Sequence, residues 1–142
     1  MITGKTITKE SFFDMLDSQY QNYIVFFVDD SGGTLTDEST MADAVNLELP
    51  SGNGYARKTL LSNSFSYSNG NIQTSTDELQ WNFTGNISFT HLCYAVQATL
   101  SNGDSTGKLE RIVAANGGNS LSFVDGESYI LPSFIILLNS TV

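Results

Sequence analysis

The sequence predicts a mainly β protein, an antiparallel β-sandwich of jelly-roll type with one N-terminal α-helix. Short β-branched and aromatic runs recur at a spacing of about ten residues, and turns rich in Gly, Asn and Asp separate them. Apolar residues make up 40% and charged residues 15%, so uncharged polar residues supply much of the surface. The 142 residues suit one domain, which we divide into a helical segment (1–22) and a β-sandwich (23–142).

The N-terminal segment carries the pattern of a helix. Thr8 can act as the N-cap, and Ile7 and Phe12 have the spacing of a hydrophobic staple. The helix is expected to end between residues 20 and 22. Its apolar stripe, with a spacing of three or four residues, consists of Phe12, Met15, Leu16, Tyr20 and Tyr23.

Strands follow the helix. A buried strand is predicted over 23–28, and a short helical turn capped by Thr36 is expected in "TDESTMADAV". Asn69-Gly70 and Asp125-Gly126 are expected to be hairpin turns. Pro132 should interrupt the last strand because it lacks an N–H group. The remaining predicted strands are 47–49, 55–61, 65–67, 72–74, 79–84, 87–100, 108–115, 121–124 and 127–138.

The charge of the chain narrows the classes of partner. A formal net charge of −9 disfavours nucleic acid and anionic membrane surfaces. The N-terminal "MITGKTITKESFF" has no apolar signal-peptide core. The apolar run 134–138 is far shorter than the roughly 20 residues of a membrane span. We therefore expect a soluble protein made in the cytoplasm.

The titratable residues do not suggest catalysis. Strand alternation in "FTHLCYAV" places Phe89, His91 and Cys93 on one face. Residues two apart on a strand lie about 7 Å from each other, too far for a catalytic dyad. We expect His91 to be structural and Cys93 to be a buried, inert thiol. The chain is therefore not expected to be an enzyme.

The acidic loop "DDSGGTLTDEST" resembles a calcium-binding loop in its content of carboxylates. With Asp29 as the first position of a calcium loop, no Glu closes the loop. Asx turns and a helix start explain the carboxylates better. A calcium site built from several loops remains open, and no cofactor is expected.

The stretch "SGNGYARKTL" places two of the six basic residues of the chain side by side. Gly52 and Gly54 permit the positive φ of a tight turn. Tyr55 and Arg57 then share a strand face, and Arg57 can lie over the Tyr55 ring or bind a carboxylate. Two interpretations remain open, a strand start with a paired surface Arg and an intersubunit contact.

Several motifs together resemble small virion structural proteins of tailed bacteriophages, over residues 23 to 138. Such proteins include capsid decoration (cement) proteins and tail components. The matching pieces are "GYAR" (54–57), "WNFT" (81–84), residues 91–96, "KLER" (108–111) and "NSLSFVDGESYIL" (119–131).

The resemblance implies an oligomeric virion protein. It would form a homotrimer that stabilises the head through contacts with the major capsid protein or another virion protein. The candidate interface residues are Tyr55, Arg57, Phe134 and Ile136, the last two in the apolar region 129–138. The alternative is a tail or fibre component that contacts host carbohydrate. The candidate carbohydrate-stacking aromatics are Trp81, Tyr67 and Tyr94, although a role in the core is the preferred expectation for each of them.

Overall fold

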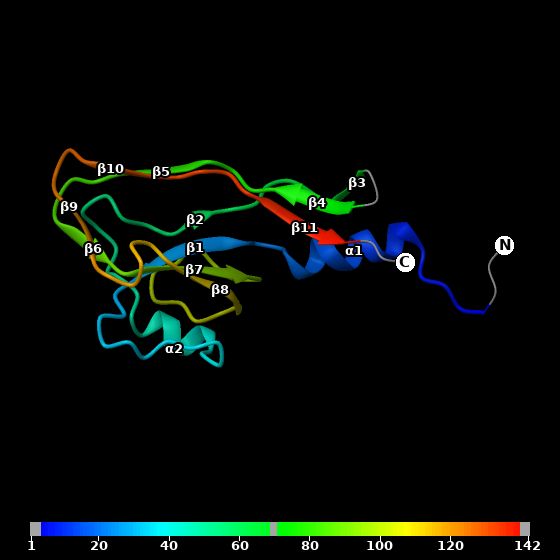
Figure 1. Cartoon of the computed structure of the whole chain (residues 1–142), viewed down its shortest axis with the longest axis horizontal. Helices are drawn as coiled ribbons and strands as arrows, with labels where there is room; N and C mark the ends of the chain where they lie inside the picture. Colours follow the sequence, from blue (N-terminus) through cyan, green and yellow to red (C-terminus); the bar gives the residue numbers. More distant parts are fainter. Residues whose placement is uncertain (1–3, 69–70, 140–142) are drawn as a thin grey trace.

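A computed structural model describes residues 4–68 and 71–139 of the chain, which is mainly β with antiparallel sheets (Figure 1). The helices are α1 (Lys9–Gln19) and α2 (Met41–Val45). The strands are β1 (Ile24–Val28), β2 (Lys58–Thr59), β3 (Ser66–Ser68), β4 (Asn71–Ser75), β5 (Leu79–Asn82), β6 (Ile87–Phe89), β7 (His91–Val96), β8 (Lys108–Ala114), β9 (Leu121–Phe123), β10 (Ser128–Leu131) and β11 (Ile135–Asn139).

The N-terminal helix forms as predicted, with Thr8 as its N-cap. The Thr8 hydroxyl accepts a hydrogen bond from the Ser11 N–H at 3.2 Å. The apolar stripe is narrower than expected because Met15 is exposed, whereas Leu16 is buried in the main core. Ile7 is also exposed. Helix α1 therefore holds to the strands mainly through the side of the helix that carries Leu16.

One sheet has the strand order β2-β1-β7-β8, and β1 lies in its interior. Every residue of β1 is buried, as the apolar run predicted. Val25 and Phe27 face the main core, while Ile24, Phe26 and Val28 face a second apolar cluster beneath α2. Both faces of this sheet are covered, which explains why β1 is continuously apolar rather than alternating.

A second layer consists of β10 paired with β5 and of the sheet β11-β4-β3. The two pieces form one long ribbon in Figure 1. The Thr76 N–H donates to the Phe134 carbonyl at 2.8 Å, where β4 leads to β5 and β10 leads to β11. The predicted interruption at Pro132 lies at this junction. We call this layer the β4–β5/β10–β11 ribbon.

Aromatic rings fill the space between the ribbon and the first sheet. The Phe27 ring from β1 stacks on Phe89 at a centroid distance of 4.1 Å. It also contacts Trp81 of β5 at 4.6 Å and Tyr129 of β10 at 5.9 Å. The main core therefore lies between two layers of strands, and Phe27 is at its centre.

Several predicted strands are shorter than expected. Region 47–49 contains an isolated bridge between Glu48 and Val28 instead of a strand, and region 55–61 contributes only β2. The predicted strand 87–100 is divided at Thr90 into β6 and β7. Because the alternation changes at this break, Phe89 lies in the main core and Cys93 in the second cluster. The prediction that these two side chains share a face was wrong.

Two turn predictions were also wrong. Helix α2 is capped by Thr40 rather than Thr36, and Thr40 forms a capping box with Asp43. Asp125-Gly126 forms a turn but not a hairpin, because β9 pairs with β6 and β10 pairs with β5. The Asn69-Gly70 prediction lies outside the described residues, although the flanking strands β3 and β4 do pair.

Candidate functional site

The glycine-rich turn brings the backbone of the "GYAR" segment into close contact with the end of β5. Gly52 and Tyr55 exchange two backbone hydrogen bonds, at 3.1 and 2.9 Å. Gly54 has a φ of 87°, and a Cβ atom there would lie 2.1 Å from the Asn82 carbonyl oxygen. Only glycine allows this close approach of two backbones.

The Tyr55 side chain points inward from this turn. It is 2% exposed and its ring stacks on Phe27 at 5.0 Å. Its hydroxyl donates to Glu48 Oε2 at 2.7 Å and accepts from the Phe27 N–H at 3.2 Å. Burial and the nearby Glu48 carboxylate raise the pKa of Tyr55. The hydroxyl therefore stays protonated and serves as a structural donor.

Arg57 forms a buried ion pair with Glu48 of the same chain. The Nη2–Oε1 distance is 2.7 Å and the Nε–Oε2 distance is 2.9 Å, a bidentate arrangement that is typical of strong Arg–carboxylate pairs. The two side chains are 0% and 2% exposed. The guanidinium lies over the ring of Phe26 at 5.0 Å, rather than over Tyr55.

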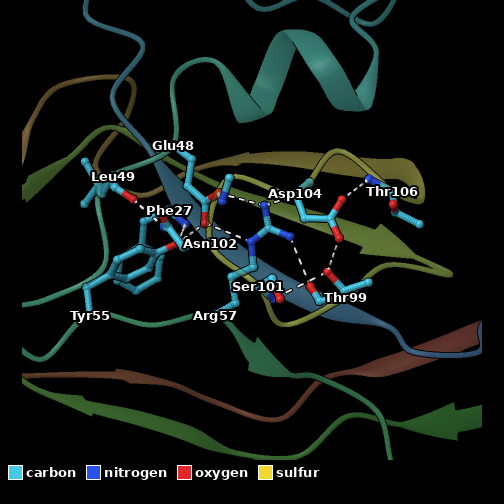
Figure 2. Close-up of polar contacts among 11 residues, drawn as sticks. Phe27, Glu48, Leu49, Tyr55, Arg57, Thr99, Ser101, Asn102, Asp104 and Thr106 are labelled. Atoms are coloured by element: carbon cyan, nitrogen blue, oxygen red, sulfur yellow. Dashed lines mark hydrogen bonds and ion pairs between the residues drawn. The ribbon is translucent and has the colours of Figure 1, made fainter.

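The same ion pair holds the loop 99–106, as Figure 2 shows. Arg57 donates to the carbonyl oxygens of Thr99 at 3.0 Å and Asp104 at 2.9 Å. The Gly103 N–H donates to Glu48 Oε1 at 2.9 Å. We call Glu48, Tyr55, Arg57 and these loop contacts the Glu48–Arg57 network.

The buried polar groups of the Glu48–Arg57 network are all hydrogen-bonded within the chain. Among the described residues, no buried side-chain nitrogen or oxygen lacks a hydrogen-bond partner. The guanidinium and carboxylate are bonded to each other and to the chain, so neither points into a cavity that could receive a substrate. The arrangement can fix a loop and stabilise the fold.

Glu48 is the network residue that the sequence prediction missed. It lies in "NLELP", where it is the single acid between Leu47 and Leu49. An isolated carboxylate in an apolar run is a signal for a buried charge, which requires a partner. That signal, together with Arg57, could have suggested the pair.

The candidate interface residues of the last strand region also lie inside the chain. Ile136 is buried in the main core, and the half-buried Phe134 stacks on Tyr94 at 5.5 Å. Their neighbours point outward, since Ile135 is 62% exposed and Leu137 is 52% exposed. The exposed apolar side chains of this strand are therefore Ile135 and Leu137, each of which is adjacent to Ile136, a candidate interface residue.

The remaining titratable candidates have local structural roles. His91 Nδ1 lies 2.8 Å from the Thr90 hydroxyl. Cys93 is buried as predicted, and burial, with Glu48 and Asp30 nearby, raises the pKa of its thiol to about 12. Such a thiol is a poor nucleophile near neutral pH.

The acidic loop is organised by Asp30. This buried carboxylate accepts hydrogen bonds from the Thr34 N–H at 2.8 Å and the Leu35 N–H at 3.0 Å. Burial alone would raise the pKa of Asp30, but these hydrogen bonds outweigh it and hold the pKa below its ordinary value. Within 4–68 and 71–139, no group of three or more His, Cys, Asp or Glu side chains is placed to hold a metal ion.

Two of the three aromatics considered for carbohydrate stacking are in the core. Trp81 is 1% exposed and Tyr94 is 5% exposed, so neither offers a ring face to a ligand. Tyr67 is exposed, but the Lys9 ammonium lies over its ring at 4.2 Å.

The described helices include none that is both long and apolar enough to cross a membrane.

In comparisons with protein-family models, with curated proteins and with solved structures, nothing matches the chain significantly.

Proposed function

We propose that the chain is a structural protein of a phage virion, a capsid decoration (cement) protein that stabilises the head by protein–protein contacts. The proposed fold is a jelly-roll-like β-sandwich, with the β2-β1-β7-β8 sheet as one layer and the β4–β5/β10–β11 ribbon as the other. Its partners would be its own copies, as a homotrimer by the resemblance, and the major capsid protein or another virion protein.

One contrast carries this proposal. The charged and polar side chains that the sequence singled out are bonded inside the chain, in the Glu48–Arg57 network and around Asp30. The outward side of the ribbon, in contrast, presents the large apolar side chains Ile130, Ile135 and Leu137. Exposed apolar groups on a regular sheet suit adhesion between proteins rather than turnover of a substrate.

The alternative function is that of a tail or fibre component that contacts host carbohydrate. Carbohydrate recognition needs exposed aromatic faces, and Trp81 and Tyr94 are buried. A tail location that depends only on protein contacts would use the same apolar surface. The experiment below therefore also records where on the virion the protein lies.

The proposal is tested on purified virions of the phage that encodes the chain. Quantitative mass spectrometry should find the chain at a fixed ratio to the major capsid protein after extensive washing. Electron microscopy should show its density on the head surface. Recovery of the chain only in the soluble fraction of lysed cells would refute a virion role, and density on the tail would refute the decoration role.

A further inference from the structure

We propose that a second copy of this chain pairs with the free edge of β11 in antiparallel orientation about a two-fold axis. The β11-β4-β3 sheets of the two copies would then form one continuous sheet. This inference rests on the self-association in the proposed function, and it assigns a two-fold contact where the resemblance implies a homotrimer.

The free edge of β11 has the properties of a pairing template. In the order β11-β4-β3, no strand within the described residues occupies the other side of β11. The strand pairs with β4 without interruption from Ile135 opposite Ser75 to Asn139 opposite Asn71. Its sequence, "IILLN", contains no charge and no proline. A regular apolar edge strand of this kind readily accepts another strand.

Both edges of the β2-β1-β7-β8 sheet are protected. Strand β8, at the edge of the first sheet, has a register shift opposite Tyr94 and Ala95. It also carries three charged residues, Lys108, Glu110 and Arg111. Strand β2, at the opposite edge, has only two residues, one of them Lys58. Bulges, charges and short length each discourage edge pairing, and β11 has none of these features.

The charge distribution identifies the occupant as a second copy. Each chain carries a net charge of −9, so two copies repel each other over most of their surfaces. On the outward face of the β11–β4 pair, Ile135 and Leu137 lie opposite Ser75 and Gln73, all uncharged. Two copies can meet here without bringing like charges together. A partner selected by charge would find no carboxylate on this face.

The sequence of β11 is also self-complementary. A two-fold axis at Ile136 places Ile135 opposite Leu137 of the partner subunit, and the reverse pair follows by symmetry. Directly opposite side chains on one face have Cβ atoms roughly 5 Å apart and stabilise the pairing. Both outward side chains, which are 62% and 52% exposed in the single chain, would thus gain an apolar neighbour. The geometry gives a dimer contact, whereas the resemblance implied a trimer.

Sedimentation velocity over a concentration series tests the contact. The wild-type chain should form a dimer at high concentration. Leu137→Lys should weaken the dimer by roughly 100-fold, since it brings two like charges close to the axis. The matched control is Leu100→Lys, because Leu100 is 54% exposed on a loop away from β11, and this variant should dimerise normally. A monomeric wild type, or an oligomer that Leu137→Lys leaves intact, would overturn the inference.

Cysteine cross-linking tests the register. A mixture of the Ile135→Cys and Leu137→Cys variants should form a disulfide-linked heterodimer in higher yield than either variant alone. Native Cys93 is buried and should not contribute. Equal yields in all three samples would overturn the proposed register.

The two proposals fail separately. A monomer that still occupies the virion head would refute the β11 contact alone. A dimer that is absent from virions would refute the proposed function alone.

Discussion

The two regions that the sequence singled out as candidate interfaces differ in where their bonding capacity is used. In the Glu48–Arg57 network, the guanidinium is bonded to a carboxylate and to two carbonyl oxygens of the same chain. On β11, one edge of the backbone has no partner strand among the described residues, and Ile135 and Leu137 point outward. The guanidinium and carboxylate of the first region are paired within one chain. The second region has a backbone edge that no strand among the described residues covers.

The difference shows that residue type alone does not identify an interface. Arg57 belongs to a residue type that is enriched at interfaces, yet a carboxylate nine positions earlier in its own chain already binds it. The aliphatic side chains of β11 form no distinctive motif, but their strand lies at a sheet edge. Whether a residue or strand is free to form an interface depends on whether its own chain already supplies a bonding partner.

The largest expected effect is on the Glu48–Arg57 network. Arg57→Ala would leave the Glu48 carboxylate buried without its cation, which costs about 3–5 kcal/mol of the free energy of unfolding. Urea denaturation followed by tryptophan fluorescence measures this loss, because Trp81 is buried in the core.

Arg111→Ala is the matched control for Arg57→Ala. Arg111 also pairs with a glutamate, Glu110, at 2.7 Å, but its side chain is 47% exposed. Exposed ion pairs contribute about 1 kcal/mol or less. Equal losses in the two variants would show that burial does not distinguish the pairs.

A smaller effect is expected at Tyr55. Tyr55→Phe keeps the ring on Phe27 but leaves the Phe27 N–H without the acceptor that it now has at 3.2 Å. An unpaired buried N–H costs about 1–3 kcal/mol. Tyr67→Phe is the control, since Tyr67 is exposed, and its melting temperature should hardly change. An unaltered melting temperature for Tyr55→Phe would mean that the hydroxyl is dispensable.

The features that the sequence predicted correctly are fixed by neighbouring residues. The Thr8 cap depends on an N–H three residues away, and the continuous burial of β1 follows from five consecutive apolar residues. The break near Pro132 follows from a missing donor. Such local constraints can be read directly from the chain.

The features that the sequence missed depend on distant residues. At the strand break, the Thr90 N–H and hydroxyl donate to the Val28 carbonyl, and the Thr90 hydroxyl accepts from the Asp30 N–H. These partners lie about sixty positions earlier in the chain. The inward side of β11 is set by packing on Tyr94 and the main core, so Ile136 rather than Ile135 is buried. The sequence prediction named Phe134 and Ile136 as interface candidates, and neighbouring residues of a strand point to opposite faces.

A pH-dependent effect is expected at Asp30, which is another inward-facing polar site. The pKa of Asp30 in the folded chain is lower than its ordinary value of 3.8. The ionised carboxylate therefore stabilises the folded state relative to the unfolded state. This stabilisation is present above that value and is lost as the pH falls through the folded pKa. Asp30→Asn should therefore lower stability by about 1 kcal/mol at pH 7.

The measurement for Asp30 is urea denaturation at several pH values. The wild type and the Asp30→Asn variant should differ at pH 7 and converge as the pH falls through the folded pKa, which lies below 3.8, because the carboxyl group is then protonated in both states. A constant difference across this range would assign the effect to packing rather than to charge.

The smallest effect on the stability of the single chain is expected at Leu137, although its effect on assembly should be large. Because Leu137 is 52% exposed, Leu137→Lys should change the free energy of unfolding of the monomer by no more than about 0.5 kcal/mol. Denaturation at a concentration below the dimer range measures this value. A loss comparable to that of Arg57→Ala would show that Leu137 supports its own fold, and the contrast between a closed network and an open edge would disappear.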